Sequence, residues 1–255
     1  MKLGQITSYI DVAQVMIWLF WAFFVGLIIY IRREDRREGY PLFSEPSNTY
    51  KSGDFFFIPP PKVFKLPHGG TATAPNGKVD ARDHRAAKVE PWPGAPLAPI
   101  GDPMLAAVGP GSYAERSNTV DLTHEGAAKI VPLRVASNFY LESRDPDPRG
   151  FDVIGGDGNS GGKVTDVWVD RSEVIIRYLE VEVAPGKTVL LPINFASIDG
   201  RRGRVNVKAI FGHHFAQVPA IANANQVTLL EEDKITGYYG GGTLYAHPSR
   251  QEPLL

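Results

Sequence analysis

The longest apolar run of the chain lies near its N-terminus, over residues 12–31. Gln14 is the one clearly polar residue in this run, which contains no charged residue. In a helix these residues would rise about 30 Å, which is the thickness of the hydrocarbon core of a bilayer. Lipid cannot satisfy open backbone groups, so a single spanning segment must be helical. The run therefore predicts a transmembrane helix over residues 12–31.

The charges on the two sides of this span are unequal. Lys2 is the one basic residue before it, whereas four arginines follow it directly, namely Arg32, Arg33, Arg36 and Arg37. A cleaved signal peptide is a poor interpretation, because the run is too long and no small-residue cleavage site follows. The positive-inside rule predicts a single-pass protein with a periplasmic tail at 1–11 and residues 32–255 in the cytoplasm.

Residues 32–115 show little hydrophobic periodicity and many prolines. Such a segment cannot form its own core, and we expect an extended, proline-rich surface segment. Apolar residues nevertheless occur in it, at 55–58, Val63, Phe64, Trp92 and 104–105. They indicate that the segment lies along another protein's surface or wraps back over its own domain. Both alternatives are open.

The pattern changes to short strands in residues 116–255. Apolar residues alternate with polar ones over 164–169, 174–183 and 205–211, and another strand is expected over 187–193. A tight turn, Asp170 to Glu173, joins the first two. Thr228 and Glu231 fit the capping box of a short helix, and Gly240 to Gly242 indicate a flexible break. The predicted fold class is thus an α+β membrane protein, with one transmembrane helix and a mainly β cytoplasmic domain that ends in a short helix and tail.

Composition narrows the classes of function. The 255 residues include 27 basic and 28 acidic ones, so nucleic acid is not an expected partner. The chain has no cysteine, which excludes disulfides, thiolate metal sites and cysteine nucleophiles. No enzyme motif is visible. His124 and Glu125 form a candidate titrating pair, and Asp166, Asp170, Glu173, Glu180 and Glu182 fall at turns and strand faces. Taken alone, these acids are most simply a solvated rim.

Seven sequence blocks, in order, resemble one family. They are residues 32–42, 66–69, 101–104, 108–110, 129–132, 164–183 and 228–246. The chain resembles the H subunit of the purple bacterial photosynthetic reaction centre over nearly its whole length. The resemblance implies that the cytoplasmic domain is a PRC-barrel, a small β-barrel.

The resemblance also implies a function. The chain would be a non-pigment-binding subunit in the bacterial inner (intracytoplasmic, chromatophore) membrane. It would cap the cytoplasmic face of the L and M subunits, stabilise them, shield the quinone sites and conduct protons to the secondary quinone. It would not be an enzyme itself and would ligate no cofactor. Bacteriochlorophyll, bacteriopheophytin, quinones and non-haem iron would lie in the partner subunits. A cytochrome subunit, a light-harvesting antenna and membrane lipids are further expected partners.

By the family's pattern, the conducting residue is the glutamate of the Asp-x-x-Glu turn, Glu173, and Asp170 and Arg177 match positions nearby. Some family members carry a histidine-rich cluster shortly before the block at 129–132. Here that segment holds one histidine and two acids, Asp121, His124 and Glu125. We include these three as candidate proton-transfer residues, although the departure leaves the point of proton uptake open.

The residues that follow the span are candidates for lipid binding, namely Arg32, Arg33, Arg36, Arg37 and Tyr40. The alternative is that these arginines only determine topology. Two rival functions are a stand-alone membrane-anchored PRC-barrel docking module and a membrane oxidoreductase with its own cofactor. The apolar residues between 55 and 110 disfavour the first, and the lack of a visible ligand set disfavours the second.

Overall fold

The computed structural model describes residues 4, 6, 7, 9–51, 58–78, 82 and 85–251 of the chain. The chain divides into two compact units, Met1–Asp80 and Ala81–Leu255, which are described separately. The second unit takes in residues 81–115, which the sequence pattern groups with the proline-rich segment. Short 3₁₀ turns connect many of the elements: η1 (Asp35–Arg37), η2 (Glu45–Ser47), η3 (Gly109–Gly111), η4 (Ile193–Phe195), η5 (Gly212–Gln217) and η6 (Pro248–Arg250).

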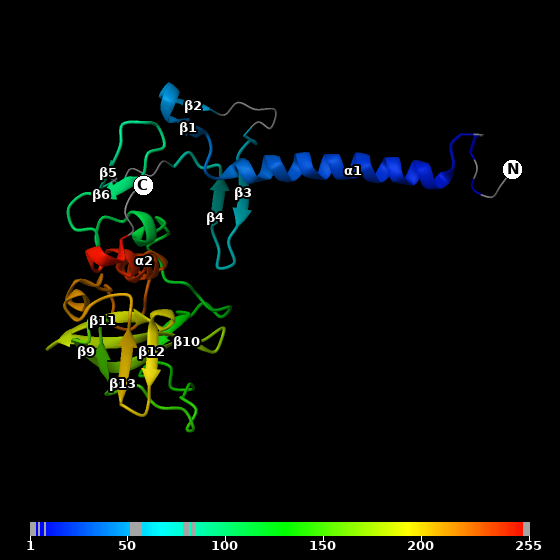
Figure 1. Ribbon diagram of the computed structural model, residues 1–255. Helices are drawn as coiled ribbons and strands as arrows, with labels where there is room; N and C mark the ends of the chain where they lie inside the picture. The colour runs from blue at the N-terminus through cyan, green and yellow to red at the C-terminus, as the bar shows by residue number, and fades with distance from the viewer. Residues whose placement is uncertain are drawn as a thin grey trace. The chain divides into compact units, whose positions relative to one another are not determined.

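The first unit is dominated by one long helix, α1 (Val12–Glu34), drawn in blue in Figure 1. Asp11 caps it by accepting a hydrogen bond of 2.8 Å from the amide of Gln14. Nearly all its large apolar side chains are exposed in the isolated chain, as lipid-facing or partner-facing residues would be; Val15 and Ile29 are half-buried. Within the described residues, it is the one helix long and apolar enough to cross a membrane.

Two β-hairpins follow α1 in this unit. They pair β1 (Leu42–Ser44) with β2 (Thr49–Lys51) and β3 (Lys62–Lys65) with β4 (Thr71–Ala74). Their strands are almost wholly exposed. The Arg37 side chain ties the end of α1 to the second hairpin, because it makes a bidentate contact with Glu34 and also donates to the carbonyls of Pro60 and Ala74 at 2.8 and 3.0 Å.

The second unit is built on a seven-stranded, mainly antiparallel sheet. Its strands run β11-β10-β9-β8-β13-β12, β7 pairs with β9, and the β8–β13 pair is parallel. Their bounds are β7 (Ile130–Pro132), β8 (Asp152–Ile154), β9 (Ser160–Asp170), β10 (Ile175–Ala184), β11 (Lys187–Pro192), β12 (Ala196–Asp199) and β13 (Arg204–Val207). A separate hairpin pairs β5 (Ala86–Lys88) with β6 (Leu97–Pro99).

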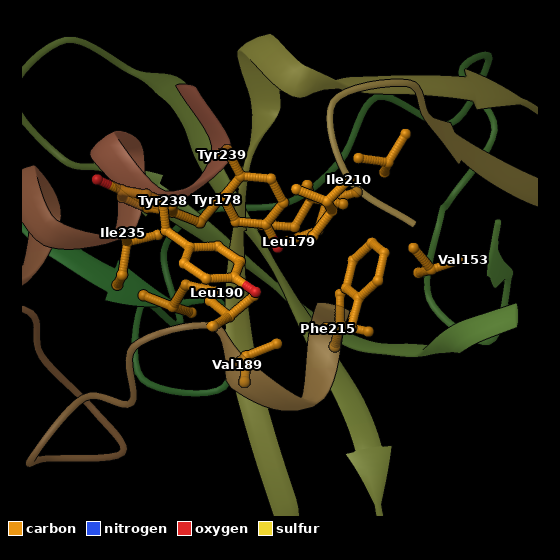
Figure 2. Close-up of a cluster of buried hydrophobic side chains, with 14 of the residues drawn as sticks. Val153, Tyr178, Leu179, Val189, Leu190, Ile210, Phe215, Ile235, Tyr238 and Tyr239 are labelled. Carbon is orange, nitrogen blue, oxygen red and sulfur yellow. The ribbon is translucent and has the colours of Figure 1, made fainter. Parts of the chain in front are cut away.

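The predicted strands are present, with one correction. The strand expected over 205–211 ends at Val207, although Ala209 stays buried as the alternation requires. The mainly β domain and the C-terminal helix are therefore confirmed. The core of the second unit contains a cluster of fully buried aromatic and aliphatic side chains. Several are drawn in Figure 2, among them Leu179, Leu190, Ile210, Phe215 and Tyr239.

Helix α2 (Leu229–Tyr245) closes this core and begins with the expected capping box. The Glu231 amide donates to Thr228 Oγ1 at 3.2 Å, and Glu231 Oε2 accepts from the Thr228 amide at 2.8 Å. The flexible break predicted at Gly240 to Gly242 is wrong, because these glycines lie inside α2. A Cβ on Gly240 would lie 2.5 Å from the Pro110 carbonyl oxygen, so close packing rather than flexibility requires glycine here.

Next to this contact lies a glycine seam between α2 and η3, formed by Gly111, Gly237 and Gly241. A Cβ on Gly241 would lie 3.1 Å from the Cα of Gly111, and one on Gly237 would lie 3.0 Å from the Gly111 carbonyl oxygen. Both distances are tighter than ordinary van der Waals contact. The helix and the turn therefore pack backbone against backbone.

Candidate functional site

The turn between β9 and β10 is organised by Asp170, whose side chain is fully buried. Its Oδ1 accepts hydrogen bonds from the amides of Ser172 and Glu173 at 2.9 and 3.0 Å, and its backbone carbonyl accepts from Val174. Val174 has φ +56°, which is strained for a β-branched residue and persists only where its surroundings hold it. Asp170 thus fixes the position of Glu173.

Two cations bridge the carboxylates of this turn, and one of them, Lys129, also reaches Asp121. Arg177 lies 3.0 Å from Asp170 Oδ2 and 3.1 Å from Glu173 Oε2. Lys129 Nζ lies 3.5 Å from Asp170, 3.5 Å from Glu173 and 3.6 Å from Asp121. We call these five side chains, Asp121, Lys129, Asp170, Glu173 and Arg177, the Lys129 cluster. It brings together four of the six proton-transfer candidates predicted from the sequence.

Burial and charge act against each other in the Lys129 cluster. Burial raises the pKa of Asp170, but the Glu173 amide, Arg177, the Ser172 amide and Lys129 together outweigh it, so this pKa is lowered. Burial likewise lowers the pKa of Lys129, yet Asp170, Asp121 and Glu173 raise it overall. Asp170 and Lys129 therefore keep opposite charges at neutral pH.

Glu232, in the first turn of α2, lies beside the Lys129 cluster. Its Oε2 accepts a 2.7 Å hydrogen bond from the Tyr178 hydroxyl. Burial raises the pKa of Glu232 and is only partly offset by Tyr178, Arg116 and Arg177, while Asp121 adds to the increase. The sequence pattern singled out neither Glu232 nor Lys129. Their roles depend on tertiary contacts, although Lys129 opens one of the seven family blocks.

His124 and Glu125 lie on a separate turn, in which the Gly126 amide donates to the Thr123 carbonyl. Both are exposed at the rim of a pocket that Arg171 and Ser172 also line. The Glu125 amide and the Thr123 hydroxyl lower the pKa of Glu125, outweighing burial. The described contacts of these two side chains are local, so they stand beside the Lys129 cluster rather than within it.

A second set of acids occupies the middle of the sheet. Arg134 Nη1 lies 3.0 Å from Asp166 and 2.8 Å from Glu180, and Glu180 also accepts from Trp168 Nε1 at 2.9 Å. Asp166, Asp170 and Glu180 are all buried. The interpretation of these three as a solvated rim is therefore wrong. Arg134 also donates to the Ala224 carbonyl, so this network ties a loop to the sheet.

The lipid-binding candidates differ in how available they are. Arg36 is buried, with its guanidinium carbon 5.0 Å from the centre of the Tyr40 ring. Arg37 is engaged by Glu34 and two backbone carbonyls. Arg32 and Arg33 are exposed, and Arg32 lies 3.4 Å from Asp35. Among the residues that the structure describes, no three acids or histidines are grouped to hold a metal ion.

Two family models match the chain. Residues 4–135 match the N-terminal region of the photosynthetic reaction centre H-chain, and residues 142–213 match the PRC-barrel domain. The first match covers more than half of the chain and includes α1, Asp121 and Lys129. The second includes β8 to β13 and therefore Asp170, Glu173 and Arg177. The chain has one N-terminal apolar helix, which fits a single-pass membrane protein, and a PRC-barrel domain. It belongs to the H-chain family of the photosynthetic reaction centre, as an H subunit.

Proposed function

We propose that this H subunit caps the cytoplasmic face of the L and M subunits and delivers protons through Glu173 toward the secondary quinone. The observation that carries the proposal is the Lys129 cluster, in which three carboxylates share two cations at the end of the β9–β10 hairpin. The resident pigments, quinones and iron are assigned to the partner subunits. When bound there, the quinone supplies the redox chemistry by accepting two electrons and two protons.

The task of this chain is then to move protons while keeping bulk water away. Neighbouring carboxylates suit this task, because like charges and partial burial raise the pKa of some carboxyl groups toward neutral pH. Asp170 is not the carrier, since two amides and two cations stabilise its ionised form. Glu173 has a side chain that is 51% exposed, so one side of its carboxylate is open to a donor or an acceptor.

An apolar groove beside Glu173 supports the capping role. It is lined by Phe139, Tyr140, Leu141, Val174, Ile175 and Ile198. Tyr140 and Val174 are 87% and 71% exposed in the isolated chain, so the groove presents apolar surface that a partner could cover. Contact between this groove and the partner subunits would surround the Glu173 carboxylate with apolar side chains that exclude water. Protons would then pass between the proteins without a leak to solvent.

The membrane arrangement follows the same proposal. The N-terminus would be periplasmic, α1 would cross the inner membrane beside L and M, and the residues after α1 would be cytoplasmic. Exposed Arg32 and Arg33 would contact anionic headgroups directly. Arg36, Arg37 and Tyr40 would support the lipid-binding surface from below through their contacts with the protein. A cytochrome subunit and an antenna are further proposed neighbours. The rival stand-alone docking module would leave the apolar groove uncovered.

Replacing Glu173 by Gln tests the proton route. The substitution keeps the shape of the side chain and removes its titrating proton. In the assembled reaction centre, the first flash-driven electron transfer to the secondary quinone should change little. The second, which is coupled to proton uptake, should slow markedly at pH 7, and small weak acids should partly restore it.

The matched control is Glu182→Gln, an exposed acid on β10 near the opposite end of the hairpin. It should leave both flashes unchanged. Unchanged second-flash kinetics in Glu173→Gln, with the complex intact, would refute the assignment of Glu173.

A further inference from the structure

The C-terminal segment, residues 247–251, is bound to the second unit through the side chain of Arg250. Its Nη1 donates hydrogen bonds of 2.7 Å to the carbonyls of Ala209 and Gly242, and its Nη2 donates one of 2.8 Å to the Lys208 carbonyl. Its guanidinium carbon also lies 4.9 Å from the centre of the Phe211 ring, which is the range of a cation–π contact. Arg250 therefore joins the C-terminal end of α2 to the loop that follows β13.

Three histidines lie around the same Phe211 ring. The centre of that ring lies 5.7 Å from the centre of the His214 ring, 5.9 Å from that of His247 and 6.2 Å from that of His213. The ring centres of His213 and His214 lie 3.9 Å apart. His214 is buried, whereas His213 and His247 are exposed. A buried imidazole and the Arg250 guanidinium thus contact one aromatic ring.

The hydrogen bond that His214 makes with its ring requires a neutral imidazole. Its Nδ1 accepts from the Phe211 amide at 3.1 Å, and a backbone N–H can only donate, so this nitrogen carries no proton. A protonated imidazole has a hydrogen on both nitrogens and would lose the bond. The backbone carbonyl of His214 also accepts from the Tyr238 hydroxyl at 2.9 Å, which holds η5 against α2. Uptake of one proton therefore replaces a hydrogen bond by a repulsive contact at the start of η5.

We propose that His214 is a pH-sensitive switch: it keeps the C-terminal segment docked on the second unit while it is neutral, and it releases this segment when it is protonated. This role is independent of the proposed proton route. The charged and titratable groups that face His214 within the described residues come from η5, the C-terminal segment and two loops, and they are His213, His247, Arg250, Asp102 and Asp157.

These neighbours determine the direction of the switch. Burial lowers the pKa of His214, and His213 and Arg250 lower it further, against the opposing effect of Asp102 and Asp157. Coupling is reciprocal, so a proton on His214 weakens the docking of Arg250 as much as docked Arg250 disfavours that proton. The docked pKa lies below the ordinary value of about 6.5. Docking is therefore fully stable above that pH and is weakened as the pH falls through the docked pKa.

A spin label on the full-length chain in detergent tests the switch. The chain has no cysteine, so Gln251→Cys gives one labelling site at an exposed position of the C-terminal segment. The electron paramagnetic resonance spectrum should show restricted motion at pH 8, and the mobile fraction should rise several-fold from pH 7 to pH 5. With His214→Gln, whose neutral side chain can still accept a hydrogen bond, motion should stay restricted over the whole range. Arg250→Gln should make the label mobile at every pH.

The other histidines provide the controls. His247→Gln should keep the transition, as should His124→Gln, which changes an exposed histidine of another loop. His213→Gln should keep it but move its midpoint to higher pH, because the effect of His213 on the His214 pKa is removed.

A transition that persists in His214→Gln, or that disappears in His247→Gln, would overturn the assignment of His214. Restricted motion in Arg250→Gln at every pH would overturn the role of Arg250. Near-UV circular dichroism at pH 8 checks that His214→Gln is folded. If it is not, His213→Gln decides, because an unmoved midpoint or a lost transition in that variant also refutes the switch.

Discussion

Asp170→Asn should destabilise the second unit, because it removes one buried charge and keeps the shape of the side chain. The carboxylate accepts hydrogen bonds from two amides, which Asn Oδ1 can still accept, and from Arg177 Nε and Nη2 at 3.2 and 3.0 Å. Lys129 lies 3.5 Å away. The substitution therefore weakens two charge-assisted hydrogen bonds and one ion pair.

The magnitude follows from these contacts. A hydrogen bond to a charged group contributes about 1.5–3 kcal/mol. Arg177 is 36% exposed and recovers some hydration, so we discount the sum to a loss of about 2–3 kcal/mol in the free energy of unfolding. The control is Asp147→Asn. It breaks an exposed pair with Arg149 and should change this free energy by less than about 1 kcal/mol.

The effect should depend on pH with a defined sign. The folded pKa of Asp170 is lowered. Its ionised form therefore contributes stability above the unfolded pKa of about 3.9, and this contribution is lost as the pH falls through the folded value. The stability gap between wild type and Asp170→Asn should be constant near neutral pH and shrink below about pH 4.

Urea unfolding of the full-length chain in detergent measures this gap, with near-UV circular dichroism reporting core residues such as Trp168. A loss below about 0.5 kcal/mol at pH 7 would contradict the argument, since that is the range of ordinary surface substitutions. A full gap that persists at pH 3 would show that the loss does not come from the charge of Asp170.

Two further substitutions test other parts of the chain. Gly242→Ala should lower the free energy of unfolding by about 2 kcal/mol or more, because its Cβ would lie 2.3 Å from Ile210 Cγ2 and 2.7 Å from the Ala209 carbonyl oxygen. Urea unfolding measures this loss, and Thr236→Ala at an exposed position of α2 is the neutral control. Arg32→Gln with Arg33→Gln should weaken retention of anionic lipid by about 1 kcal/mol for each arginine. Native mass spectrometry measures this retention, equal retention would favour a role in topology alone, and Arg144→Gln in the second unit is the control.

The sequence predicted the elements whose signal is local. Alternating apolar residues placed β9, β10 and β11, and Thr228 with Glu231 marked the start of α2. Family resemblance pointed to Glu173, Asp170 and Arg177, which composition and spacing alone would have left as surface residues.

Long-range contacts explain what the sequence did not predict. Pairing of Ile130 with Asp170 brings β7 against β9, and this places Lys129 among three carboxylates. Gly240 to Gly242 have low helix propensity, yet tight packing against the 108–111 turn and Ile210 outweighs that propensity. Burial of Asp166 and Glu180 depends on Arg134, more than thirty residues before the first of them in the chain.

The glycine seam also constrains how this protein can diverge. Gly111 lies within residues matched to the H-chain N-terminal region, whereas Gly237 and Gly241 lie beyond the barrel match. Backbone contact leaves no side chain that could shrink to accommodate a larger partner. A change at one position therefore cannot be compensated by a change at the other. We expect the turn at 109–111 and α2 to be inherited together. Selection would then act on the barrel segment together with these two flanking elements, and not on the barrel segment alone.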